Sequence, residues 1–186
     1  MSSVSSPFGL RPSQVFGGQV RQIAGTIITG LASDIFQYSP VRWADATGGL
    51  IPAPAGDTNI LGVFLGVEWT GSDGRRRVSN MWESGRTGTD IVAYHTFDPM
   101  QVYDIQAVGS VAQLNVGDMA NYDALSGNST TGLADFTLDA TMAATAANLR
   151  IVSINPGPDN VVGDAFTIVQ VLIAEHAFNA FTVNKS

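Results

Sequence analysis

The chain has 186 residues, of which 45% are hydrophobic and only 13% charged, with a formal net charge of −7 and no cysteine. The lack of cysteine excludes disulfide-stapled scaffolds, thiolate metal sites and cysteine nucleophiles. The acidic balance argues against a nucleic-acid partner, because affinity for phosphates comes from Lys and Arg side chains that displace counterions.

Residues 1–22 are predicted to form an extended N-terminal arm. Two prolines and three glycines in this segment disfavour a helix and a central strand. Phe8, Leu10 and Phe16 are nevertheless large apolar side chains, which a merely solvated segment would not need. Two alternatives stay open: the arm lies on a neighbouring molecule, or it folds back on its own domain. The segment lacks the pattern of a signal peptide, and no apolar run approaches the ~20 residues that cross a bilayer, so we expect no membrane partner.

Residues 23–186 are predicted to form a single β domain. Beta-branched and aromatic residues alternate with polar ones, and turn residues interrupt the runs roughly every ten positions. Pro40 predicts that its strand is an edge strand or a bulged one. Ser110, Gln113 and Gly117 have the spacing of a helix of at most two turns. The predicted strands cover 23–28, 35–43, 61–70, 75–82, 91–97, 100–107, a short stretch near 136, 149–154 and 165–176.

The clearest local signal is a hairpin. The turn Gly71-Ser72-Asp73-Gly74 separates two alternating runs, and Asp-Gly is a strong hairpin signal because glycine adopts the positive φ that such turns require. On the first strand we expect one face to carry alternate apolar side chains, namely Leu61, Val63, Leu65, Val67 and Trp69.

These elements predict an all-β fold, an antiparallel β-sandwich or barrel with at most one or two short helices. No alternation of strands with long helices occurs, which disfavours a parallel sheet. In the last strand, Phe166, Ile168 and Leu172 are the expected core residues.

The sequence offers little for catalysis. His95 and His176 lie in predicted strands, no nucleophile elbow or phosphate-binding loop occurs, and no set of three metal ligands is closely spaced. We therefore expect no enzyme activity, no catalytic residue, no metal and no cofactor. A hydrolase using two carboxylates is the weakest alternative; its candidates by residue type are Glu68, Glu83, Asp98, Asp104 and Glu175.

Three adjacent arginines, Arg75, Arg76 and Arg77, follow the hairpin turn. Guanidinium groups pair bidentately with carboxylates and suit protein interfaces. Two interpretations stay open: a contact to a partner subunit, or a solvated charged end of the hairpin.

Several blocks, taken in order, resemble a group of phage-encoded head proteins. The resemblance covers nearly the whole chain, and the order of the blocks is more specific than any one of them. It departs from the group at Arg75–Arg77 and at the loop 121–147. The blocks are Pro7-Phe8-Gly9-Leu10-Arg11-Pro12, Asn59 to Thr70, Thr89 to Tyr94, Leu149-Arg150-Ile151, Pro158-Asp159-Asn160 and Val171 to His176.

The resemblance implies a viral structural protein, a decoration (cement) subunit on the exterior of an HK97-type phage head that stabilises capsomer junctions. The implied partners are the major capsid protein and further copies of the chain, with a trimer favoured over a dimer. The implied location is the outer head surface of the virion, after assembly in the host cytoplasm. The predicted contact residues are Pro7, Phe8, Leu10, Arg11, Pro12, Phe16, Trp69, Arg75, Arg76, Arg77 and Trp82.

The alternative from another class is a β module of the virion that binds carbohydrate or the host surface. Exposed Trp43, Trp69 or Trp82 would form its binding platform.

Overall fold

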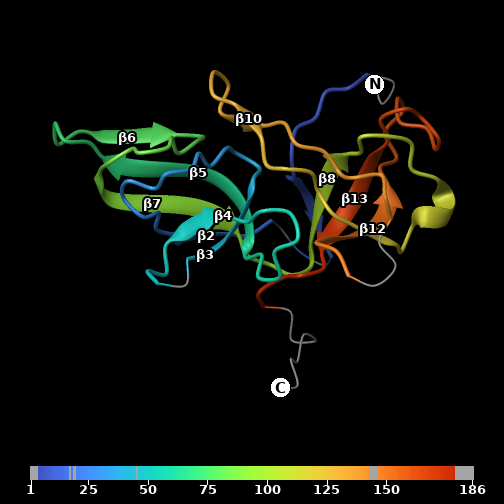
Figure 1. Ribbon diagram of the computed structural model, residues 1–186, viewed down its shortest axis with the longest axis horizontal. Helices are drawn as coiled ribbons and strands as arrows, with labels where there is room; N and C mark the ends of the chain where they lie inside the picture. Colours follow the sequence, from blue (N-terminus) through green and yellow to red (C-terminus); the bar gives the residue numbers. More distant parts are fainter. Residues whose placement is uncertain (1–3, 17, 19, 45, 143–145, 179–186) are drawn as a thin grey trace.

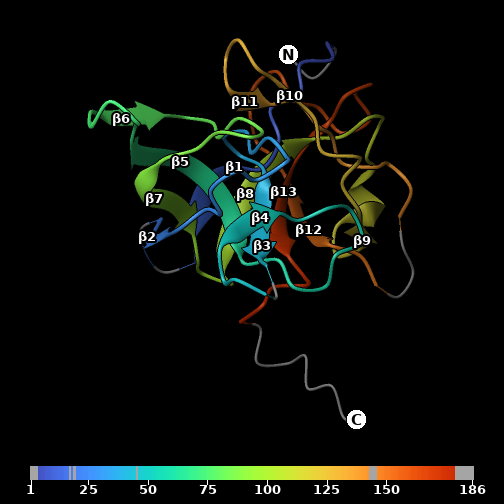
Figure 2. The ribbon, with the colours of Figure 1, turned by 60° about the vertical axis from the view of Figure 1, so that its left-hand side comes forward.

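The computed structural model describes residues 4–16, 18, 20–44, 46–142 and 146–178. These residues form an all-β fold of two packed antiparallel sheets, sandwich-like and not closed into a barrel. This confirms the predicted fold class. Figure 1 shows the two sheets side by side along the long axis of the molecule, and Figure 2 shows them turned by 60°.

The first sheet has six strands in the order β2-β7-β5-β3-β4, with β6 paired to the far half of β5. All of its strands lie within residues 22–96. Their bounds are β2 Gln22–Gly25, β3 Pro40–Trp43, β4 Leu50–Pro52, β5 Gly62–Thr70, β6 Arg76–Ser79 and β7 Thr89–Thr96.

The second sheet has five strands in the order β1-β8-β13-β12-β9. Apart from β1, all come from the second half of the chain. Their bounds are β1 Arg11–Val15, β8 Gln101–Gln106, β9 Met119–Ala120, β12 Leu149–Ile154 and β13 Ile168–Ile173. A small pair, β10 Gly127–Asn128 and β11 Leu133–Ala134, and one 3₁₀ turn, η1 Gln113–Asn115, complete the described elements.

Strand β5 separates two hydrophobic cores. Val63 packs in the core of the five-stranded sheet, and its neighbour Phe64 packs in the core of the six-stranded sheet. Opposite β7 the register then shifts between Phe64 and Gly66, so that Leu65 is an extra residue. A bulge of this kind reverses the alternation, because successive side chains point to opposite faces. The predicted single apolar face from Leu61 to Trp69 is therefore wrong.

The predicted hairpin is confirmed. Trp69 pairs with Arg77, and the Gly74 amide donates to the Gly71 carbonyl across the turn at 2.9 Å. The second strand is shorter than predicted, because the chain leaves β5 after Ser79. Trp82 then forms an isolated bridge with Ile35.

Two other predictions are wrong. Strand β3 lies between β4 and β5, so Pro40 does not mark an edge; it is the first residue of its strand, where proline is tolerated. In the last strand the predicted core residues, Phe166, Ile168 and Leu172, are only half-buried, and the core residues of β13 lie on the opposite face. The buried residues are Val169, Val171 and Ile173.

The N-terminal segment folds back on its own chain from Leu10 to Val15. Strand β1 pairs antiparallel with β8, and Leu10 is fully buried in the core of the five-stranded sheet. The Leu10 amide donates to the Tyr38 carbonyl at 3.0 Å. Of the two alternatives for the arm, these residues follow the second. That residues 23–186 act as one domain stays a prediction.

Candidate interaction surfaces

Five exposed apolar side chains gather at one edge of the molecule, where the two sheets meet. We call this set the basal patch: Phe16, Val20, Trp43, Met100 and Phe178, with relative exposures of 41–51%. They come from four separate parts of the chain. Figure 1 shows the β7–β8 connection and the last described residues together at the lower edge of the molecule. Contiguous apolar surface on a folded protein commonly marks an interaction site.

The strand register brings the N-terminal segment to the patch. Val15 pairs with Gln101, so the next residue, Phe16, lies beside Met100. Gln22 pairs with Thr96 in antiparallel β2 and β7, so the chain before Gln22 runs towards the turn that holds Met100. That turn is closed by the Gln101 amide, which donates to the Asp98 carbonyl at 3.0 Å.

Aromatic contacts complete the patch. The rings of Trp43 and Phe178 meet edge to face, with centroids 5.4 Å apart. Phe97 lies beneath them, with its ring centroid 4.6 Å from that of Phe178. Such pairs contribute roughly 0.5–1.5 kcal/mol beyond their area burial. These contacts order the part of the patch that Trp43 and Phe178 form.

A buried histidine supports the patch from below. The Phe178 amide donates to Nδ1 of His176 at 3.1 Å, so this nitrogen is unprotonated. Burial lowers the pKa of His176 to about 4, although the negative charge of Asp98 acts in the opposite direction. His176 is therefore neutral near pH 7, and its protonation would remove the acceptor that orients Phe178.

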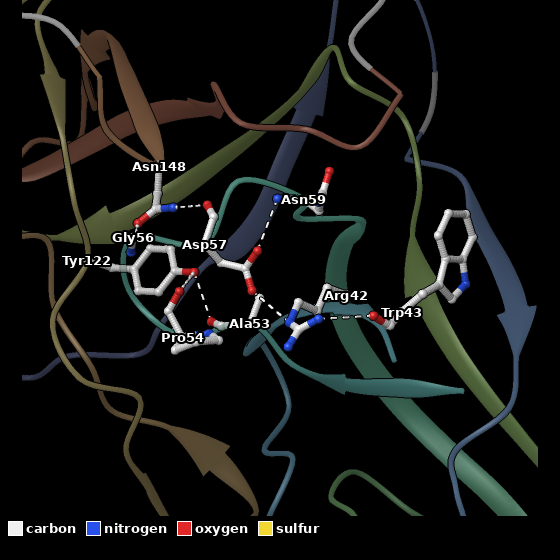
Figure 3. A network of polar contacts seen from close by, with 9 residues as sticks. All are labelled: Arg42, Trp43, Ala53, Pro54, Gly56, Asp57, Asn59, Tyr122 and Asn148. Atoms are coloured by element: carbon white, nitrogen blue, oxygen red, sulfur yellow. Dashed lines mark hydrogen bonds and ion pairs between the residues drawn. The ribbon is translucent and has the colours of Figure 1, made fainter. Parts of the chain in front are cut away.

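A polar network fixes the strand that carries Trp43 (Figure 3). Arg42 Nε lies 2.7 Å from a carboxylate oxygen of Asp57, and Arg42 Nη1 donates to the Trp43 carbonyl at 3.3 Å. Asp57 belongs to the loop after β4, and this loop contacts the segment directly before β12 of the five-stranded sheet. There the Asn148 side chain donates to the Asp57 carbonyl at 2.6 Å and accepts from the Gly56 amide at 2.7 Å.

Tyr122 contacts the first residues of the same loop. Its hydroxyl lies 2.9 Å from the Ala53 carbonyl and 3.1 Å from the Pro54 carbonyl. The loop thus joins the six-stranded sheet, through Arg42, to the segment before β12, through Asn148 (Figure 3). Because the basal patch draws on both sheets, this network also fixes the relative position of its members.

The hairpin places the three arginines on the surface, each near a carboxylate of its own hairpin. Arg75 Nε lies 3.9 Å from Asp73, Arg77 lies 3.1 Å from the same carboxylate, and Arg76 lies 3.2 Å from Glu68. Hydrogen bonds from Arg76 and Tyr94 lower the pKa of Glu68, and those from Arg75 and Arg77 lower that of Asp73. Exposed pairs of this kind contribute about 0–1 kcal/mol, so the arginines remain available to a partner.

The two tryptophans predicted as contact residues are core residues. Trp82 is fully buried and Trp69 nearly so, and their rings meet edge to face at 5.8 Å. The guanidinium of Arg86 lies 4.5 Å from the Trp69 ring. Neither indole is available to a partner or to a sugar in this fold. Trp43 is the one tryptophan of the chain with an exposed ring.

The predicted residues of the arm divide into two groups. Leu10 is a core residue, which excludes it as a contact, and Pro7, Phe8 and Pro12 are half-buried. Arg11 lies 4.6 Å from the Phe8 ring and 3.7 Å from Asp104. Phe16 is exposed, so within the arm it is the predicted contact with the most available apolar surface.

The described residues contain no group of three or more His, Cys, Asp or Glu side chains that could hold a metal ion. Their helices include none long and apolar enough to cross a membrane. His95 is buried, and burial lowers its pKa; its Nδ1 lies 2.7 Å from the Thr96 carbonyl, so this nitrogen carries the proton.

Of the carboxylates proposed for a hydrolase, Glu68, Glu83 and Asp104 each lie near an arginine. Asp104 accepts a hydrogen bond from Gln170 and lies near Arg11. Glu175 and Asp57 both line a small cavity of about 100 Å³, but Asp57 is ion-paired with Arg42. A groove of about 590 Å³ has apolar walls from Leu31, Ile51, Pro52, Pro54 and Leu125, with Ser33 as its polar side chain. That groove lacks the acid and base of a catalytic pocket.

Comparison with known proteins gives no match: no family model, no curated protein and no solved structure is similar to this chain.

Of these five residues, the sequence predicts only Phe16 as a contact to a partner. It predicts Trp43 only as part of a sugar platform, and nothing near Val20, Met100 or Phe178 in the sequence marks them as contacts. They come together through the pairing of β1 with β8 and of β2 with β7, which sequence alone did not predict.

Proposed function

We propose that this chain is a phage capsid decoration subunit that binds the outer surface of the head through the basal patch. The observation that carries the proposal is the gathering of Phe16, Val20, Trp43, Met100 and Phe178 on one edge of a rigid β fold. The resemblance of the sequence blocks to phage head proteins supports the same class of function.

The physical account needs surface and rigidity rather than chemistry. A subunit that binds across neighbouring capsomers favours only their assembled geometry, so it stabilises the shell by mass action. Many copies on one shell then add avidity. A patch that draws side chains from both sheets, fixed by the Arg42–Asp57–Asn148 network, presents its anchors at low cost in conformational entropy.

The test is co-sedimentation with expanded heads that lack the protein. The double substitution Phe16→Ser and Met100→Ser removes two half-exposed apolar side chains, and we expect it to weaken binding by about 10-fold to 100-fold, as for hot-spot residues. Deleting residues 1–18 is a poorer experiment, because it also removes Leu10 from the core.

The matched control is Val4→Ser with Leu133→Ser. Both residues are exposed apolar side chains outside the patch. We expect this control to bind as the unaltered chain does. Equal binding by the control and the patch variant, with both correctly folded, would remove the patch from the proposal. Failure of the unaltered chain to bind heads would remove the capsid as the partner.

A second candidate function, sugar binding, is favoured by the exposure of Trp43. Its ring lies beside Phe178, and aromatic faces are common sugar platforms in proteins. Glycan-array binding that is lost in Trp43→Ala would favour this alternative. A decoration subunit predicts no glycan binding.

A further inference from the structure

The two ends of the long axis differ in their chemistry. One end is the tip of the β5–β6 hairpin, which projects beyond the six-stranded sheet in both ribbon views (Figures 1 and 2). We call residues 71–78 the hairpin tip. The opposite end is formed by residues 108–118, which include η1, and by the loop 156–166 between β12 and β13. We call these two segments the acidic end.

Charge is divided unequally between the two halves of the chain. Residues 1–98 contain eight carboxylates and seven arginines, whereas residues 99–178 contain eight carboxylates and one arginine. The division coincides with the fold, because the six-stranded sheet lies wholly within the first range and all but β1 of the five-stranded sheet within the second. The hairpin tip contains three arginines and one aspartate, and the acidic end contains three aspartates and no basic residue.

Each end also exposes apolar side chains that the fold does not use. Leu114 at the acidic end is 80% exposed and Val78 at the hairpin tip is 78% exposed, the two highest values among the exposed large hydrophobic residues described. Val108, Val161 and Val162 add to the acidic end and are also exposed.

Thr167 holds the two segments of the acidic end together. Its carbonyl accepts from the Ala107 amide at 2.9 Å, and its hydroxyl oxygen accepts from the Val111 amide at 3.2 Å. The same hydroxyl donates to the Asp164 carbonyl at 3.0 Å. The two segments of the acidic end are therefore neighbours in the fold.

We propose that the hairpin tip of one copy docks on the acidic end of a second copy. Val78 would pack against the apolar group around Leu114, and the arginines would lie among the carboxylates at its rim. Arginine and apolar anchors with opposite charges at the rim are the usual composition of an interface that gains both affinity and orientation.

The contact is heterologous, since it joins two different surfaces. Such contacts generate a closed ring when the rotation between copies closes and an open filament when it does not. The basal patch takes no part in the contact and stays free. The inference goes beyond capsid binding and does not depend on it, because it concerns two copies of the chain in solution.

The test is sedimentation velocity of the unaltered chain and of two variants, each over a series of concentrations. The hairpin variant carries Arg75→Glu and Arg77→Glu, and the acidic-end variant carries Leu114→Lys and Val161→Lys; these side chains are exposed, so the fold should tolerate the changes. We expect each variant alone to self-associate about tenfold or more weakly than the unaltered chain. The matched controls, Arg21→Glu and Val4→Lys, change exposed residues elsewhere and should associate normally.

Mixing the two variants is the decisive step. The mixture contains one intact hairpin tip and one intact acidic end, so we expect a 1:1 pair that grows no further. Raising the ionic strength to about 1 M, where the Debye length is about 3 Å, should weaken that pair.

Three results would overturn the proposal. They are an unaltered chain that stays monomeric throughout the series, variants that associate as well as the controls do, and a mixture that forms no pair although the unaltered chain associates. Circular dichroism and thermal melting of each variant show whether a loss of association reflects a loss of fold.

Discussion

Leu10 and Phe16 lie six residues apart in the same N-terminal segment and should respond to substitution in opposite ways. Leu10 is fully buried in the core of the five-stranded sheet, whereas Phe16 is half-exposed in the basal patch. Replacing a buried leucine by alanine costs about 3–5 kcal/mol of unfolding free energy, from lost transfer energy and the cavity left behind. Truncating an exposed side chain is expected to change it by no more than about 0.5 kcal/mol.

For a chain of this size, about 1 kcal/mol corresponds to a shift of roughly 2–4 °C in the melting temperature. We therefore expect Leu10→Ala to lower Tm by roughly 6–20 °C and Phe16→Ala to leave it nearly unchanged. Differential scanning calorimetry measures both values, and co-sedimentation with heads at a temperature where both variants are folded measures binding. In the binding measurement the order of the two variants should reverse: Phe16→Ala should bind heads more weakly than the unaltered chain, and Leu10→Ala should bind them almost normally.

Unchanged stability in Leu10→Ala would refute the reasoning. It would mean that the segment before β2 is not part of the core and is free to act as an arm on a neighbour. A loss of head binding in folded Leu10→Ala would point the same way.

Two further predictions concern the fold around the patch. Gly62→Ala should destabilise the chain by several kcal/mol in urea unfolding, because the added Cβ would overlap the Thr96 carbonyl, whereas the control Gly18→Ala adds a methyl group to open space. His176 should lower the unfolding free energy by at most about 3 kcal/mol between pH 6.5 and pH 4, because the unfolded chain protonates it near pH 6.5 and the folded chain only near its pKa of about 4. This contribution should be constant above that range and level off below it. Much of that slope should disappear in His176→Asn, which keeps an acceptor for the Phe178 amide. The remainder reflects His95, whose pKa burial also lowers, and, towards pH 4, Glu68 and Asp73, whose pKa values are lowered by their hydrogen bonds. A slope unchanged in His176→Asn would contradict the assignment.

Local signals in the sequence were reliable where the structure they specify is local. The hairpin followed from Gly71 to Gly74, because the turn residues and the two flanking runs lie within a few positions of each other. Strand β12 lies at its predicted bounds for the same reason, since one apolar run is ended by a proline turn.

Predictions that needed the position of a strand within the whole fold were wrong. The alternation along β5 changes phase at Leu65, and the only local sign of the extra residue is the glycine directly after it, Gly66, because glycine inside a strand often marks a bulge. Strand β13 has apolar residues on both faces because it is central in its sheet, so alternation could not tell that Val171 rather than Leu172 faces the core.

The candidate site was the least predictable feature. Sequence composition favours tryptophan and arginine as contact residues, but Trp69 and Trp82 fill the core of the six-stranded sheet. The basal patch depends on β1 crossing to the second sheet, and this places Phe16 beside Met100, 84 positions away along the chain. Long-range pairing of this kind leaves no periodic trace in either segment.

Electron cryomicroscopy of the intact virion would show where this chain lies in the particle. We expect density for this fold on the outside of the head, with the edge that carries Phe16, Trp43 and Met100 turned towards the shell. A virion with no such density on its exterior, or with that edge facing solvent, would contradict this expectation.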